Sequence, residues 1–193
     1  MSDIMISEIL HRSAEVKNKM ISVCAGPAEQ AAQMIAASMR KGGKLMLCGN
    51  GGSAGDSQHL AAEFVATLDH TKPRSGLPAL SLTTDTSFLT AYANDFGFEG
   101  VFARQVEALG QPGDVLLGIS TSGNSKNVLA AAKAAKDNQI SVIAFTGETG
   151  GQMADFADLL VAIPSRIIMH IQECHIALGH AITARVETLL SEK

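Results

Sequence analysis

Residues 44–64 read KLMLCGNGGSAGDSQHLAAEF, an apolar segment followed by a glycine-rich turn and a stretch with helical character. Because the apolar segment does not alternate with polar residues, it is typical of a strand buried on both faces of a parallel sheet. Glycines in the turn permit positive φ and close approach of the backbone. We expect Ser53 to cap the helix, with Asp56 as its capping-box partner. This order of strand, turn and helix predicts one unit of an α/β fold.

Short apolar runs alternate with helical stretches along the rest of the chain. After KLMLCG come ALSLTT, DVLLGIS, SVIAFTG and DLLVAIP, with helices expected near 124–137 and 168–190. Two further helices are expected before the first strand, separated by a break at Gly26-Pro27. The alternation predicts a parallel sheet with helices on both faces. Ligands of such sheets bind beyond the carboxyl ends of the strands, so functional residues are expected just after each strand.

Length and composition favour one domain spanning residues 1–193, because 193 residues with 46% hydrophobic content are too few for two ordinary domains. The net charge of −4, without Lys and Arg clustered among aromatics, argues against a nucleic-acid partner. No segment has the length of a membrane span or a signal-peptide core, so we expect a cytoplasmic protein without a membrane partner. Its three widely spaced cysteines fit buried packing positions better than a disulfide framework.

Hydroxyl groups crowd the turn after DVLLGIS, where the chain reads STSGNS from Ser120 to Ser125. Such hydroxyls, together with the free amides at a helix start, form a neutral cradle for a phosphate group. The alternative is that Ser122 or Ser125 merely caps the next helix, which explains one hydroxyl and leaves the others unexplained. The turn after the first strand likewise offers free amides, which would attract an anion or a sugar hydroxyl.

Two helical segments carry candidate acid, base or metal-binding side chains. His59 and Glu63 are four residues apart and therefore share one helical face, a spacing that serves either a metal or an acid/base pair. A solvated polar face is the alternative. In the last helix Gln172, His175 and His180 lie within about two turns. Spacing alone does not choose among them, because Glu173 aligns with His180 more closely than Gln172 does, and the histidines could be structural.

Several motifs resemble those of the phosphoheptose isomerases (sedoheptulose 7-phosphate isomerases), which are SIS-domain sugar-phosphate-binding proteins. The motifs are GNGGSAxDxQHxAxEF, LTTDTS, ANDFGFE, GDVLLGISTSGNSxNV, FTGxxGGxM and IQExHxxLGH, spread from about Lys41 to His180. The resemblance implies a three-layer SIS-type α/β fold with a five-stranded parallel sheet. It also implies a homotetramer with active sites at subunit interfaces and with helices of residues 1–40 contributing to oligomer packing.

The resemblance also implies roles for single residues. Glu63 and His180 correspond to the catalytic acid/base pair. The zinc site, with one ion per subunit, corresponds to His59, Glu63, Gln172 and His180. The substrate-binding residues of the family correspond to Asn50, Gly51, Gly52, Ser53, Asp95, Ser120, Thr121, Ser122, Ser125 and Gln172.

The implied reaction is the aldose–ketose isomerisation of sedoheptulose 7-phosphate to D-glycero-D-manno-heptose 7-phosphate through an enediol, which supplies precursors of lipopolysaccharide or capsule. Two alternatives remain open. The first is an isomerase of another ketose phosphate. The second is a non-catalytic SIS protein that binds a sugar phosphate or a partner, although such relatives lack the glutamate and histidine present here as Glu63 and His180.

Two positions depart from the family pattern beside the expected site. Thr67 stands where the family commonly has an arginine, and Met169 precedes the IQE motif where Asp or Thr is usual. These departures bear on the sugar that is recognised more than on phosphate binding. The missing positive charge could come from Lys72, Arg74 or Arg166.

Overall fold

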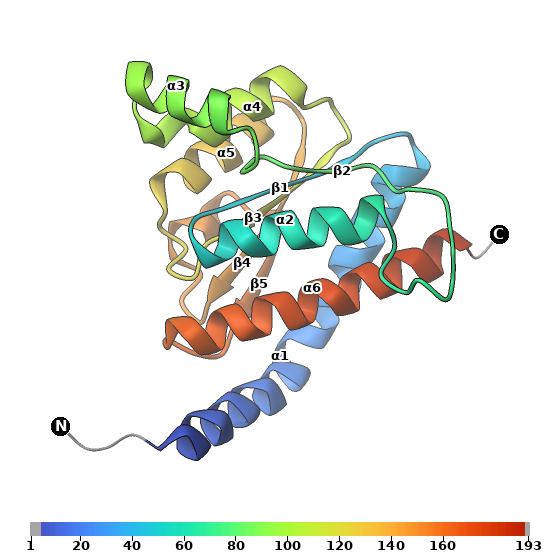
Figure 1. Ribbon diagram of the computed structural model, residues 1–193, viewed down its shortest axis with the longest axis vertical. Coiled ribbons are helices and arrows are strands. Elements are labelled where there is room, and N and C mark those ends of the chain that lie inside the picture. The colour runs from blue at the N-terminus through green and yellow to red at the C-terminus, as the bar shows by residue number, and fades with distance from the viewer. Residues whose placement is uncertain (1–4, 192–193) are drawn as a thin grey trace.

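The five apolar runs form one parallel sheet in the computed structural model, which describes residues 5–191, so that the predicted domain limits lie outside the described residues. The strands lie in the order β2-β1-β3-β4-β5 (Figure 1). Their bounds are Leu45–Gly49 for β1, Ala79–Ser81 for β2, Val115–Ile119 for β3, Ser141–Gly147 for β4 and Leu159–Ile163 for β5. Every residue of β1 and β3 is buried, as their continuous apolar character predicts.

Helices cover both faces of the sheet and give three layers (Figure 1). Leu45 and Leu47 pack toward α1, α2 and α6, whereas Met46 and Cys48 pack toward α4 and α5. The three cysteines are buried and free, which confirms their predicted packing role. The helices are α1 (Ile6–Arg40), α2 (Gly52–Val65), α3 (Thr86–Phe96), α4 (Val101–Leu109), α5 (Lys126–Asp137) and α6 (Ile168–Ser191), with 3₁₀ turns at Phe98–Gly100 and Gly151–Asp155.

The prediction of two helices before the first strand is wrong, because α1 runs without interruption for 35 residues and contains Pro27. Proline removes one backbone hydrogen bond and bends a helix. Here Cys24 and Ala28 are buried on either side of the bond, and their tertiary packing offsets its loss. The axis of α1 changes direction near its middle (Figure 1). Within residues 5–191, no helix is long and apolar enough to cross a membrane.

Helices α3 and α4 were not predicted between the second and third apolar runs. Asp85 starts α3 by accepting a hydrogen bond from the backbone of Phe88 (2.9 Å). No residue of α3 is fully buried, whereas α4 buries Val101, Phe102 and Val106. Together they bridge β2 to β3, the strand on the opposite side of β1.

The strand order changes direction beside β1, since the chain passes from β1 outward to β2 and then returns to β3. Ligands of open α/β sheets bind at such a switch point, beyond the carboxyl ends of the strands. The glycine-rich turn follows β1 and the hydroxyl-rich turn follows β3. The fold therefore places both predicted ligand-binding turns side by side.

Candidate active site

A pair of asparagines ties the two turns together. Asn50 follows β1, and Asn127 lies in the first turn of α5. Their side-chain amides exchange two hydrogen bonds, each of 2.8 Å. Asn127 is buried and was not singled out from the sequence, where its only signal is its place in the GNSKNV motif. This pairing fixes the position of the turn after β1 relative to the turn after β3.

The turn after β3 gathers its hydroxyl groups around Ser120. The Oγ of Ser120 lies 2.9 Å from that of Ser125 and 3.5 Å from that of Ser122. Although Ser125 is the N-cap residue of α5, its side chain makes no capping hydrogen bond. The alternative reading of Ser125 as a simple helix cap is therefore wrong, and its hydroxyl stays within the cluster at a helix N-terminus.

The turn after β1 starts its helix differently from the prediction. Gly51, at φ 57°, is the N-cap residue of α2, and no side chain caps this helix. Ser53 lies inside the first turn and is buried, so the predicted capping box with Asp56 is wrong. The positive φ of Gly51 turns the chain into the helix by backbone alone. A Cβ on Gly52 would come within 2.6 Å of the Gln172 amide nitrogen, so Gln172 lies against the start of α2.

Helices α2 and α6 lie side by side and run in the same direction (Figure 1). They approach closely at Gly179, where an added Cβ would meet the Leu60 side chain at 2.6 Å. Any larger residue there would require the buried Leu60 side chain to shift. Because His59 precedes Leu60 and His180 follows Gly179, the close approach brings the two histidines together.

His59, Glu63 and His180 form a cluster between these helices. The Nε2 atoms of the two histidines are 2.8 Å apart, and the Glu63 Oε1 atom lies 3.4 Å from the His59 Nε2. One ligand atom from each residue lies within 4.8 Å of the others. Glu63 is half-buried and His59 is about half exposed, so the cluster opens to solvent. All three side chains belong to one chain.

Asp56 lies one helical turn before His59 and adds a fourth ionisable group. Burial raises the pKa of its carboxyl, an effect that His59 and His180 oppose by their positive charge. Its Oδ2 atom is buried and has no hydrogen-bond partner among the described residues. Asp56 therefore responds electrostatically to both histidines, a role that its predicted capping function did not anticipate.

The remaining candidates on α6 point elsewhere. Glu173 accepts a hydrogen bond from Ser13 and faces Lys17 at 4.0 Å, so it is turned toward α1. His175 is fully buried, and its Nε2 donates to the Thr146 carbonyl (3.1 Å). Burial lowers the pKa of His175 to about 4. These contacts settle which face of α6 meets α2, a question that helical spacing left open.

Comparison with known proteins agrees with this geometry. Residues 10–147 match the SIS domain family. A phosphoheptose isomerase from Roseiflexus sp. is 49% identical over 189 residues, which cover 98% of this chain and 94% of that protein. The chain belongs to the phosphoheptose isomerase family. The family resemblance inferred from the sequence motifs is thereby confirmed.

Other phosphoheptose isomerases match along nearly the whole chain. The protein from Aquifex aeolicus is 48% identical over 188 residues, which cover 97% of each chain. A solved phosphoheptose isomerase from Neisseria gonorrhoeae has a TM-score of 0.89 and 43% identity, covering 95% of this chain and 97% of its own. One from Francisella tularensis has a TM-score of 0.91 and 34% identity, with coverage of 95% and 96%. The three-layer SIS fold is thus confirmed, and the chain is a sugar-phosphate isomerase.

The structure separates the three cations that could replace the arginine usual in phosphoheptose isomerases. Lys72 is exposed and pairs with Asp69 at 3.6 Å. Arg74 is bound to backbone carbonyls and to Glu187. Arg166 pairs with Glu148 and lines a groove of about 330 Å³ together with Thr121 and Ser122. Arg166 alone of these three lies beside the hydroxyl turn.

Two further sequence candidates lie at the margins of the site. Asp95 is exposed on α3 and accepts a hydrogen bond from the neighbouring Asn94 (2.8 Å). Within residues 5–191 no contact joins its side chain to the histidine cluster. Met169 is 47% exposed in the first turn of α6, and the Thr67 hydroxyl donates to the Asp69 carbonyl (3.3 Å). Neither departure from the family pattern places a charge at the cluster.

Proposed function

We propose that this phosphoheptose isomerase family member interconverts sedoheptulose 7-phosphate and D-glycero-D-manno-heptose 7-phosphate. The observation that carries the proposal is the meeting of the Glu63 carboxylate with the His180 imidazole, within 4.8 Å, between two closely packed helices. A carboxylate and an imidazole at this separation can serve two different protons of one small substrate. The names of the relatives support a heptose phosphate as that substrate.

The hydroxyl turn after β3 is proposed to hold the phosphate. Ser120, Ser122 and Ser125 supply hydroxyl donors, and Thr121 adds a fourth. The N-terminus of α5 adds backbone amides and the positive end of its dipole. This arrangement binds a dianion mainly through neutral donors, which suits a substrate that must also leave.

The sugar is proposed to extend from that turn toward α2. Asn50 is held in place by Asn127, and Gln172 lies against the start of α2. Gly51, Gly52 and Ser53 complete the turn between them. Asp95 would reach the same sugar from α3 of a neighbouring subunit, since its exposed side chain makes no contact with the cluster in its own chain within the described residues.

The chemistry follows from the positions of the acid and the base. Glu63 removes the proton from C1 of the ketose and returns it to C2, which passes the substrate through an enediol. His180 moves protons between the two oxygens of that intermediate.

The cluster also fits a zinc ion. Two imidazole nitrogens and a carboxylate oxygen are ordinary zinc ligands, and the separations of 2.8 and 3.4 Å resemble the edges of a tetrahedral site. His59, Glu63 and His180 would hold the ion, with the Gln172 side chain as a fourth ligand. When bound, zinc supplies a Lewis acid that polarises the substrate carbonyl. One zinc per subunit is therefore part of the proposal.

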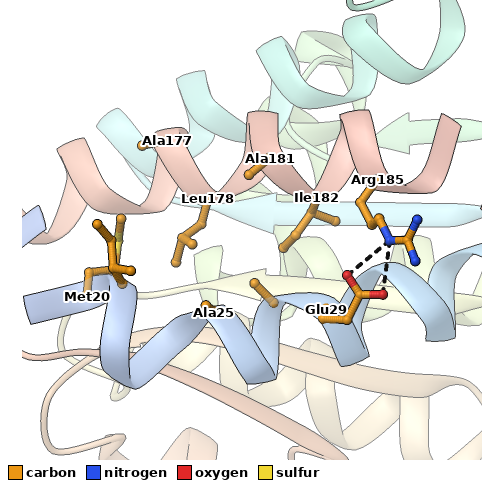
Figure 2. A pocket seen from close by; sticks show the side chains of 10 residues that line it. Met20, Ala25, Glu29, Ala177, Leu178, Ala181, Ile182 and Arg185 are labelled. Carbon is orange, nitrogen blue, oxygen red and sulfur yellow. Dashed lines mark hydrogen bonds and ion pairs between the residues drawn. The ribbon is translucent and has the colours of Figure 1, made fainter. Parts of the chain in front are cut away.

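A homotetramer is also proposed, on the evidence of apolar surface along α1 and α6. The two helices border an open groove of about 310 Å³ (Figure 2). Met20, Ala25, Leu178 and Ala181 line it, and the Arg185–Glu29 ion pair closes one end (Figure 2). Further along α1, Ile6 and Leu10 are 77% and 63% exposed. Apolar surface of this extent is characteristic of a subunit interface.

A second candidate is isomerisation of another ketose phosphate. It is favoured by the engagement of Arg74 with backbone carbonyls and by Thr67, which leave no arginine at the position usual in the family. A non-catalytic binding role is disfavoured, because the cluster of Glu63 and His180 is intact. The heptose product would serve lipopolysaccharide or capsule precursors.

The direct test is turnover of sedoheptulose 7-phosphate by the purified protein, with and without zinc. Glu63→Gln and His180→Gln should each lower kcat about 10³-fold, which is the usual contribution of a positioned acid or base. Glu107→Gln, an exposed change on α4, is the matched control and should keep full activity. Turnover of fructose 6-phosphate or ribulose 5-phosphate in preference to the heptulose would favour the second candidate.

A further inference from the structure

We propose that Arg74 is a positioning residue that fixes the end of α2 on α6 and thereby sets the separation of Glu63 from His180. Arg74 lies in the loop between α2 and β2, outside the cluster itself. The inference rests on the proposed function for its activity and zinc-affinity readouts. Its NMR readout depends on the helices alone.

The guanidinium of Arg74 binds the last turn of α2 directly. Its NH2 group donates to the carbonyl of Glu63, and its NH1 group donates to that of Phe64, both at 2.9 Å. Carbonyls in the last turn of a helix have no partner within the helix, and a cation there is favoured by the helix dipole. No basic residue of α2 itself occupies this turn. Arg74 therefore supplies a side-chain cap to the Glu63 carbonyl and shares the Phe64 carbonyl with the backbone N–H of Leu77.

The same guanidinium is anchored to α6. Its Nε donates to the Glu187 Oε1 at 2.7 Å, and that oxygen also accepts from the Leu68 backbone at 3.2 Å. Glu187 follows His180 by seven residues, about two turns, and so lies on the same face of α6. Arg74 thus joins the backbone carbonyl of Glu63 to α6, the helix that carries His180.

The two side chains are only 17% and 18% exposed, so the bridge is largely shielded from solvent. Breaking one partner of a shielded ion pair leaves the other charge uncompensated. Arg74 also donates from NH1 to the Ser75 carbonyl (2.9 Å). With four of its donor contacts directed at protein atoms, the guanidinium is a structural clamp rather than a ligand for substrate phosphate.

Together with the Gly179 contact, this clamp holds α2 against α6 at two positions along the helix axes. Gly179 sets the approach at Leu60, in the middle of the pair. Arg74 sets the distance between the two helices at the end of α2, beside Glu63. Without the clamp, the Glu63 carbonyl loses its donor, and the Glu63 carboxylate is less firmly held relative to the His180 ring.

The test compares Arg74→Met with Lys44→Met in the full-length protein. Lys44 forms a similar pair with Asp114 (2.6 Å, 25% and 2% exposed) at the amino ends of the strands, far from the cluster. For Arg74→Met, kcat should fall about 100-fold with KM nearly unchanged, as expected for a small displacement of a catalytic group. The zinc dissociation constant of the metal-free protein, measured by competition with a chromophoric chelator, should rise about tenfold. Lys44→Met should change neither.

Two further variants keep the test decisive if Arg74→Met does not fold. Arg74→Lys retains the charge but not the planar fork, so it should not restore kcat. Glu187→Gln retains the acceptor oxygen and should shift the same readouts less. Equal kcat and zinc affinity in the Arg74 and Lys44 variants would overturn the inference.

A metal-independent readout separates this inference from the proposed function. The imidazole NMR signals of His59 and His180 in the metal-free protein should shift in Arg74→Met and stay unchanged in Lys44→Met. If the wild-type protein does not turn over the heptulose phosphate, the proposed function fails while this comparison still decides the role of Arg74. Unshifted signals in Arg74→Met would overturn the clamp even in an active enzyme.

Discussion

Helix α6 packs against two helices, α2 and α1, and a different feature lies beside each contact. Toward α2, Gly179 allows a contact with Leu60 so close that a single added carbon would clash. Toward α1, the same helix makes a more extensive buried contact and borders a groove of about 310 Å³ that is lined mainly by apolar side chains (Figure 2). The side toward α2, the close side, carries the ionisable cluster, and the side with the groove, the open side, carries exposed apolar surface at Ile21.

The difference teaches how one helix can serve chemistry and assembly at once. Close packing fixes backbone positions, and a site that needs its groups within fractions of an ångström must lie on such a contact. Open packing leaves apolar area that a second chain can bury. On this basis, changes on the α2 side should alter catalysis, whereas changes on the α1 side should alter assembly.

The largest effect on activity is expected from Gly179→Ala, which disturbs the contact between α6 and α2. The added methyl group would lie 2.6 Å from the buried Leu60 side chain, which must move and thereby disturb the packing of α2 on α6. We expect kcat to fall about 100-fold through misplacement of the Glu63 carboxylate, and the zinc affinity to fall about tenfold. Steady-state kinetics and chelator competition measure the two effects.

Gly26→Ala is the control for that change. Gly26 lies inside α1 with no atom within 4 Å of its added Cβ, so alanine should be tolerated and should stabilise the helix by about 0.5–1 kcal/mol. A Gly179→Ala protein as active as Gly26→Ala would show that the close contact does not position the cluster.

An intermediate effect, on assembly rather than zinc binding, is expected from Ile21→Glu on the open side. Ile21 is 66% exposed and lines the groove, so a single folded chain loses little by the change. A buried carboxylate at an apolar interface would be costly, so the proposed tetramer should dissociate. Sedimentation velocity measures the mass, while zinc affinity should stay within about twofold because all the cluster residues come from one chain.

Gln33→Glu, an exposed polar change on α1, serves as the control for charge alone. If Ile21→Glu keeps the mass of the wild-type assembly, this groove is not part of a subunit interface. Loss of zinc binding in the same variant would argue that the cluster depends on a neighbouring chain.

The smallest effect is expected from His175→Gln, on the face of α6 that meets the sheet. Burial lowers the pKa of His175 from 6.5 to about 4, so between these values the unfolded chain binds a proton that the folded chain does not. Stability should therefore fall on acidification, by about 2 kcal/mol between pH 7 and pH 5 from this residue. Glutamine keeps a donor for the Thr146 carbonyl but does not titrate.

Urea unfolding of the metal-free protein at both pH values measures this contribution. The wild-type protein should lose more stability than His175→Gln over the same interval. An identical loss in the two proteins would show that His175 takes up its proton equally in the folded and unfolded chains.

Much of the fold was readable from the sequence because buried parallel strands are continuously apolar. KLMLCG and its four counterparts all form strands, and the two candidate turns follow β1 and β3 at the carboxyl ends of the strands. The spacing of His59 and Glu63 also placed them on one face of α2. These features depend on residues close together in the chain, so the spacing of side chains along the sequence predicts them.

The features that could not be predicted from the sequence depend on tertiary contacts. Pro27 stays inside α1 because the flanking residues are buried, and Gly51 replaces Ser53 as the helix start through its positive φ. The orientation of α6 is set by Gly179 packing on Leu60, so helical spacing could not choose between Glu173 and Gln172. Arg74 could not be assigned as a clamp, because its carbonyl partners are visible only in three dimensions.

The most direct test of the central claim follows the hydrogen that Glu63 is proposed to move. Sedoheptulose 7-phosphate would be converted in D₂O by the wild-type protein, and NMR would report deuterium at C2 of the aldose product. Because the Glu63 carboxylate is partly exposed, the proton that it removes should exchange with solvent while the enediol lasts, so deuterium is expected at C2. Glu63→Gln should lose both turnover and deuterium uptake. Unchanged turnover and unchanged deuterium uptake in Glu63→Gln would contradict the assignment of Glu63 as the carbon base.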